Sequence, residues 1–160
     1  MSSIEKDTLK EKYKDLLSSF NSFRSSLSIK DMHAELKFDP EDIGRELERQ
    51  PSLYFYYAGL YSNAEEYEAR FKNLAKTAEG VIEQGIRKEA REKRIKETDS
   101  SVKSRLASDE FYNEVLSSLV DAQKLLSLLK VLKESFYMRR DMLVQVSANK
   151  RELASNYISS

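Results

Sequence analysis

The sequence predicts an all-α protein of long antiparallel, coiled-coil-like helices, with a smaller helical N-terminal part, that assembles into a homo-oligomer. The 160-residue chain has only four glycines and two prolines, so it can form few tight turns. Charged residues make up 34% of it and hydrophobic residues 40%, a balance typical of long helices with much solvated surface. Apolar residues also recur at spacings of three and four, the pattern of helices that supercoil around one another.

The N-terminal quarter of the chain predicts shorter elements. Apolar residues from Ile4 to about Leu27 share one helix face, but serines weaken the end of this helix. We therefore expect residues 1–28 to form a partly separate, mobile N-terminal helix, and residues 29–160 to form the main domain. The stretch from Asp31 to Phe38 stays ambiguous.

A second helix is predicted to begin at Asp39-Pro40. Asp39 can cap the helix, and Pro40 suits its first position. We expect this helix to end near Gln50, because Pro51 follows and proline breaks helix interiors.

The next stretch predicts one helix of roughly forty residues or more, because its apolar positions follow a 3.5-residue repeat. These positions are Leu53, Tyr57, Leu60, Ala64, Tyr67, Phe71, Leu74, Ala78, Val81 and Gly85, and the pattern continues through Ile86, Ala90 and Ile95. A polar interruption predicts a bend or short loop between about residues 98 and 108.

The last helix is predicted to begin at Ser108, a plausible cap that precedes two acidic residues. Its seam comprises Phe111, Val115, Ser118, Ala122, Leu125, Leu129, Leu132, Phe136, Arg139, Leu143, Val146, Lys150, Leu153 and Tyr157. Because Arg139 and Lys150 interrupt this seam, we expect its end to meet acidic or aqueous surroundings.

A second apolar stripe widens the face of this last helix beyond what one partner helix can cover. The stripe consists of Leu116, Leu119, Val120, Leu126, Leu128 and Val131. We therefore expect self-association, and the residues predicted to mediate it are Val115, Leu119, Ala122, Leu125, Leu126, Leu129, Leu132 and Phe136.

The residue types favour a protein that is not an enzyme. The chain has no cysteine and one histidine, His33, so sulfur-ligated metal sites and histidine-based triads cannot form within it. Its glycines are isolated, so no phosphate-binding loop is predicted. We expect no cofactor, no metal and no membrane association, and a cytoplasmic location, in the host cell if a phage encodes the chain.

Basic residues outnumber acidic ones by eight to four between Ile86 and Arg105, although the whole chain has no net charge. Arg87, Arg91 and Arg94 would share one helix face, where guanidinium groups could bind a phosphate backbone. The candidate nucleic-acid-binding residues are Arg87, Lys88, Arg91, Lys93, Arg94, Lys96, Lys103 and Arg105. A solvated helix end with Glu–Arg pairs is the alternative, and Arg139 and Arg140 belong to a second basic group.

Tyrosines crowd the start of the long helix at Tyr54, Tyr56, Tyr57 and Tyr61, together with Phe55. Exposed members could stack on unpaired bases. Aromatic residues at helical spacing more often pack in a core, and Tyr57 belongs to the seam.

The chain resembles the UvsY-type recombination mediators of T-even-like phages over roughly residues 31–155. The resemblance depends on PSLYFYYAGLYSNAEEYEARFKNLAK, the basic EGVIEQGIRKEAREKRIKETD, SVKSRLASDEFYNEVLSSLVDAQKLLSLLK and LKESFYMRRDMLVQVS. The family's short basic-and-leucine motif falls near residues 88–92, where Ala90-Arg91 matches and Glu92 replaces a leucine.

The resemblance implies a ring-like homo-oligomer that binds single-stranded DNA without sequence preference. Such a protein helps a RecA-like recombinase to displace single-strand-binding protein and nucleate its filament. Single-stranded DNA, the recombinase, the single-strand-binding protein and further copies of the chain are therefore the expected partners. The alternative is a helical scaffolding protein that binds only other proteins.

Overall fold

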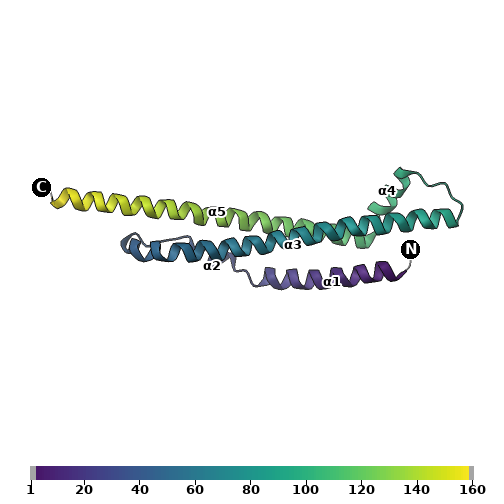
Figure 1. Cartoon of the computed structure of the whole chain (residues 1–160), viewed down its shortest axis with the longest axis horizontal. Helices are drawn as coiled ribbons and strands as arrows, with labels where there is room; N and C mark the ends of the chain where they lie inside the picture. The colour runs from purple at the N-terminus through teal and green to yellow at the C-terminus, as the bar shows by residue number, and fades with distance from the viewer. Residues whose placement is uncertain (1–2, 159–160) are drawn as a thin grey trace. The chain divides into compact units, whose positions relative to one another are not determined.

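The computed structural model describes residues 3–158, and every regular element among them is helical (Figure 1). The elements are α1 (Ser3–Ser25), α2 (Ile29–Glu35), the 3-10 turn η1 (Pro40–Asp42), α3 (Ile43–Glu92), α4 (Asp99–Ala107) and α5 (Glu110–Ile158). The all-α prediction is confirmed. No helix within residues 3–158 is long and apolar enough to cross a membrane.

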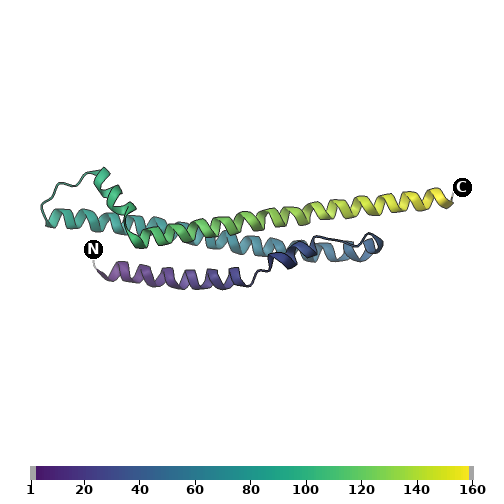
Figure 2. The same cartoon turned by 180° about the vertical axis from the view of Figure 1, so that it is seen from behind.

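The chain divides into two compact units. Unit 1 comprises Met1–Ser26 and Glu65–Leu125, and unit 2 comprises Leu27–Ala64 and Leu126–Ser160. This division differs from the expected boundary between residues 28 and 29. The reason is that α1 packs against α3 and α5 within unit 1, as Figures 1 and 2 show for α1 and α3.

Unit 1 has an aromatic and aliphatic core between α1, α3 and α5. Phe20 of α1 and Phe71 of α3 meet edge to face, with ring centroids 5.5 Å apart. Tyr13 packs on Phe111 of α5, and its hydroxyl lies 3.0 Å from the buried hydroxyl of Ser118. Edge-to-face aromatic pairs stabilise a core beyond their buried area, so α1 is an integral part of unit 1.

Unit 2 is built around a stacked pair of rings, Tyr57 of α3 and Phe136 of α5, whose centroids are 4.1 Å apart. The Tyr57 hydroxyl donates a 2.8 Å hydrogen bond to Glu35, which joins α2 to α3. Burial and this carboxylate raise the pKa of Tyr57. Ser28 caps α2 and Asp39 caps η1, where Pro40 occupies the first helical position as predicted.

A buried charge holds three segments of unit 2 together. The side chain of Arg139 on α5 is only 2% exposed and forms an ion pair with Glu46 of α3. Its guanidinium also donates to the side chain of Gln50 and to the backbone oxygens of Leu36 and Lys37. Further along α5, Lys150 lies 3.5 Å from Glu41. The end of the seam was expected to meet acidic or aqueous surroundings, and both interrupting cations lie beside a carboxylate.

The predicted helix end before Pro51 is wrong, because α3 continues through Pro51. A proline inside a helix loses one backbone hydrogen bond, at a cost of about 3 kcal/mol. Packing on both sides of Pro51 offsets this cost, since Gln50 and Leu53 are buried. Gln50 also donates a 2.6 Å hydrogen bond to the backbone oxygen of Phe136 on α5.

The predicted seams correspond to the buried side of α3 and α5. Most positions from Leu53 to Ala78 and from Phe111 to Leu143 are buried or half-buried. The seam ends earlier than predicted on α5, because Lys150 and Leu153 are exposed. The side chains of Ile4 and Tyr157 lie outside the described residues.

Replacing Glu46 by Ala should lower the free energy of unfolding by about 3–5 kcal/mol, because it leaves the buried charge of Arg139 without its carboxylate. Glu48→Ala, at an exposed position of the same helix, is the matched control and should change stability by less than about 0.5 kcal/mol. Urea denaturation followed by circular dichroism measures both variants. Equal stabilities would show that the buried pair does not hold unit 2 together.

Candidate nucleic-acid interface

Helix α3 ends in a capping motif that sequence reasoning missed. The amide of Ile95 donates to the Ala90 carbonyl at 2.9 Å, and that of Arg94 donates to the Arg91 carbonyl at 3.1 Å. These are the two bonds of a Schellman motif, in which the first residue after the helix cap, here Arg94, is left-handed. Arg94 takes that conformation, with φ of 54°. Glycine is the usual residue at this left-handed position. Because the sequence has Arg94 instead, the end of α3 could not be predicted from a glycine.

The chain then passes through a short loop into α4. Thr98 caps α4 by accepting a hydrogen bond from the amide of Ser101, and the helix buries Val102 and Leu106 in the core of unit 1. The loop therefore lies at residues 93–98, before the predicted range of 98–108. At the next boundary Asp109 caps α5, since it accepts from the Tyr112 amide, while Ser108 ends α4.

We call residues 86–105, which join α3 to α4, the turn, and ion pairs engage each of its four acidic residues. Glu89 accepts hydrogen bonds from Lys93 and from Arg105, which together lower the pKa of Glu89 to about 2. Arg87 donates to Asp99 at 2.8 Å and lowers the pKa of that carboxyl group. The two remaining acids also have partners, since Glu97 lies 3.6 Å from Arg105 and Glu92 lies 3.9 Å from Lys88.

Of the eight candidate binding residues, four form no ion pair with a carboxylate in the described part of the chain. We name Arg91, Arg94, Lys96 and Lys103 the turn cluster; all four are exposed, and all belong to unit 1. The expected row of three arginines does not form, because Arg94 lies beyond the end of α3 and Arg87 is paired with Asp99. Of the eight candidate binding residues, Arg87, Lys88, Lys93 and Arg105 are therefore in internal pairs.

Most residues predicted to mediate self-association are covered by the chain's own helices. Val115, Ala122, Leu129, Leu132 and Phe136 are buried in a single chain, whereas Leu119, Leu125 and Leu126 are half-buried. Their burial therefore needs no second copy. The second stripe does stay partly uncovered, since Val120, Leu128 and Val131 are exposed.

The tyrosine-rich segment divides between core and surface. Tyr57 is buried, as its seam position predicts, whereas Tyr54, Phe55 and Tyr56 are exposed. The second basic group divides in the same way. Arg139 is buried, and Arg140 is half exposed beside Asp141.

The residues from 3 to 158 contain no cluster of three potential metal ligands among His, Cys, Asp and Glu. Comparisons with models of protein families, with curated proteins and with solved structures gave no match.

Replacing Arg105 by Gln should raise the pKa of Glu89 from about 2 toward its usual 4.5, because the carboxylate loses one of its two charged partners. The pKa of Glu89 is lower in the folded chain than in the unfolded chain, so its ion pairs stabilise the turn at pH values above the unfolded-state pKa. This contribution is lost as the pH falls through the folded-state pKa. Carbon-13 NMR of the glutamate carboxyl groups measures the titration.

Arg91→Gln is the matched control, since Arg91 makes no described ion pair, and Glu89 should titrate there as in the original protein. An unchanged Glu89 titration in Arg105→Gln would contradict the arrangement of this turn.

Proposed function

We propose that this chain is a non-catalytic single-stranded-DNA-binding protein that acts as a recombination mediator. It helps to load a RecA-like recombinase onto strands covered by single-strand-binding protein. The observation that carries this proposal is the turn cluster. Its four exposed cations remain after the nearby carboxylates have found partners.

The four exposed cations of the turn cluster, between residues 91 and 103, suit a phosphate backbone. Each phosphate that they neutralise releases condensed counterions, which favours binding at low salt and carries no sequence information. The ion pairs of Arg87 with Asp99 and of Arg105 with Glu89 join α3 to α4, and the four cations of the turn cluster contact the strand. A flexible single strand can follow such an irregular cluster more readily than a stiff duplex.

Self-association completes the proposal. The net charge of the chain is zero, so one copy attracts DNA only through the local field of the turn cluster. Symmetric copies, joined through the exposed stripe of α5 in a coiled-coil-like manner, would repeat this cluster several times along a strand. The protein can then hold the strand in a shape that the recombinase accepts. Binding alone is enough, because it shifts the equilibrium of the strand toward that shape.

Exchanging Arg91 and Arg94 for Glu should weaken binding to an oligo-dT strand by at least about 100-fold at low salt, because two phosphate contacts become repulsions. Lys72→Glu with Lys76→Glu is the matched control: the same change in net charge on exposed positions of α3 outside the turn cluster. Fluorescence anisotropy measures both, and circular dichroism confirms helicity. Equal losses in the two variants would mean that only net charge matters.

The mediator role has its own test. On a strand saturated with single-strand-binding protein, addition of this chain should shorten the lag before the recombinase begins DNA-dependent ATP hydrolysis. The Arg91→Glu/Arg94→Glu variant should leave the lag unchanged, and the lysine control should shorten it. A lag that stays constant over a full titration of the original protein would contradict a mediator role.

A scaffolding protein that binds only other proteins is the second candidate, and the exposed apolar residues of α5 favour it. Val120, Leu128 and Val131 of α5 are exposed in a single chain. Exposed apolar surface on a helix can serve as a protein interface. A chain that self-associates in light scattering yet binds no oligo-dT at low salt would be a scaffold.

A further inference from the structure

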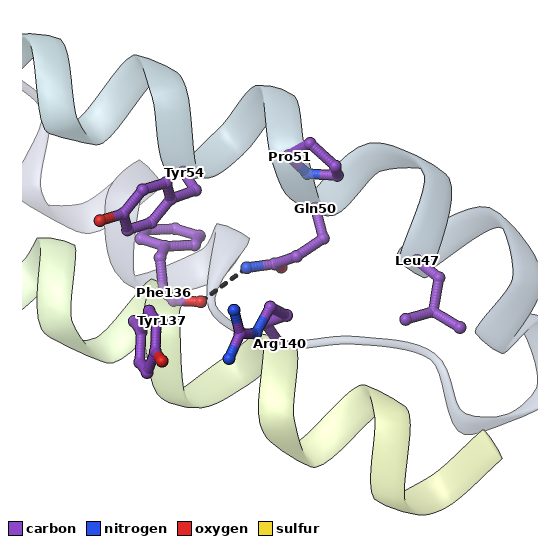
Figure 3. A pocket seen from close by; sticks show the side chains of 7 residues that line it. All are labelled: Leu47, Gln50, Pro51, Tyr54, Phe136, Tyr137 and Arg140. Carbon is purple, nitrogen blue, oxygen red and sulfur yellow. Dashed lines mark hydrogen bonds between the residues drawn. The ribbon is translucent and has the colours of Figure 1, made fainter. Parts of the chain in front are cut away.

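A groove of about 300 Å³ opens between α3 and α5 in unit 2 (Figure 3). We name it the tyrosine groove, and its lining residues are Leu47, Gln50, Pro51, Tyr54, Phe136, Tyr137 and Arg140. Its volume is at the lower end of the range for small-molecule sites, so it fits one planar ring system rather than a large ligand. Most of its surface is apolar, and Arg140 is its only charged lining residue.

Aromatic rings and cations are paired along this side of unit 2. Tyr54 and Tyr137 meet at an angle of 60°, with centroids 6.4 Å apart. The guanidinium carbon of Arg140 lies 4.3 Å from the centre of the Tyr137 ring. Lys133 lies 3.9 Å from the centre of the Tyr61 ring. Lys133, Tyr137 and Arg140 follow one another at spacings of four and three, so they share one face of α5.

The base of the groove needs no polar partner. The amide nitrogen of Gln50 donates to the Phe136 carbonyl, and its oxygen accepts from Arg139. An apolar flat group can therefore enter without leaving a buried polar atom unpaired. At the edge, Arg140 pairs with Asp141, but about half of its side chain is exposed, and no carboxylate lines the groove.

We propose that the tyrosine groove holds an unpaired base of a bound single strand, with the neighbouring phosphate on Arg140. This proposal rests on the proposed function and adds a base-stacking site to it. A base is flat and apolar on its faces and carries its negative charge on the adjoining phosphate, which matches the rings of Tyr54 and Tyr137 beside a guanidinium. Stacking on tyrosine and arginine tolerates any base.

A peptide side chain is the other occupant to consider. Methionine-rich grooves are typical of surfaces that bind varied peptides, whereas tyrosine rings and arginine guanidinium planes stack on unpaired bases. The groove has one leucine and no methionine among its lining residues. The charge and ring geometry therefore favour the nucleic acid.

The test compares two strands with the same phosphates, oligo-dT and an oligomer of abasic sites. The original protein should bind oligo-dT about ten-fold more tightly, since one stacked base contributes that order of affinity. Tyr54→Leu with Tyr137→Leu should bring this ratio close to one while affinity for the abasic strand stays unchanged. Phe55→Leu, at an exposed ring that does not line the groove, is the matched control and should keep the ratio.

A second measurement does not depend on mutant folding. A strand carrying 5-iodouracil, irradiated in complex with the original protein, should form crosslinks to Tyr54 or Tyr137, located by mass spectrometry. Crosslinks confined to other residues, or a base preference that survives the double variant, would overturn this inference and leave the proposed function standing. Failure to bind either strand would instead overturn the proposed function. A double variant that loses only self-association would identify the groove as a protein-docking site.

Discussion

The charge of Arg139 can be buried only where a carboxylate and several backbone or amide oxygens meet it, because an unpaired guanidinium in a core is very costly. Glu46, Gln50 and the backbone oxygens of Leu36 and Lys37 supply these groups from two separate segments of the chain. An apolar seam alone lets two helices slide by one heptad with little loss. The buried pair removes that freedom, since any other register would leave Arg139 unpaired. Register in turn places Tyr54 beside Tyr137 and so creates the tyrosine groove.

Unit 1 uses charge in a different way, at the surface. Glu89 is shared between Lys93 and Arg105, and this pairing ties the end of α3 to α4. Exposed ion pairs contribute little to stability, so the buried Val102 and Leu106 hold α4 in place. These pairs also engage the nearby carboxylates, so none of those carboxylates forms an ion pair with the turn cluster. In the proposed function, the turn cluster is therefore available to an anionic partner.

The sequence predicts the helical class and the two long seams, because burial follows a periodic pattern that can be read directly. It does not predict the course of α3 through Pro51, since the packing of Gln50 and Leu53 that offsets the proline comes from distant residues. The α3 end is also hidden, because Arg94 fills a position where glycine is expected. The prediction that Arg87, Arg91 and Arg94 share one helix face was wrong for this reason, since α3 ends at Glu92, before Arg94. All four members of the turn cluster lie in the basic stretch between Ile86 and Arg105, and their role in binding stays a prediction.

The proposal that the turn cluster binds the phosphates of a single strand is tested most directly by the salt dependence of binding to oligo-dT. This dependence counts the phosphates that the protein neutralises. If the four cations of the turn cluster each contact one phosphate, the logarithm of affinity should fall by about 0.7 per contact for each logarithm of salt, or about 2.8 in total per chain. Neutralising Lys96 and Lys103 together should reduce that slope by about 1.4. A slope that the neutralised variant leaves unchanged would contradict the account and place the phosphates elsewhere on the protein.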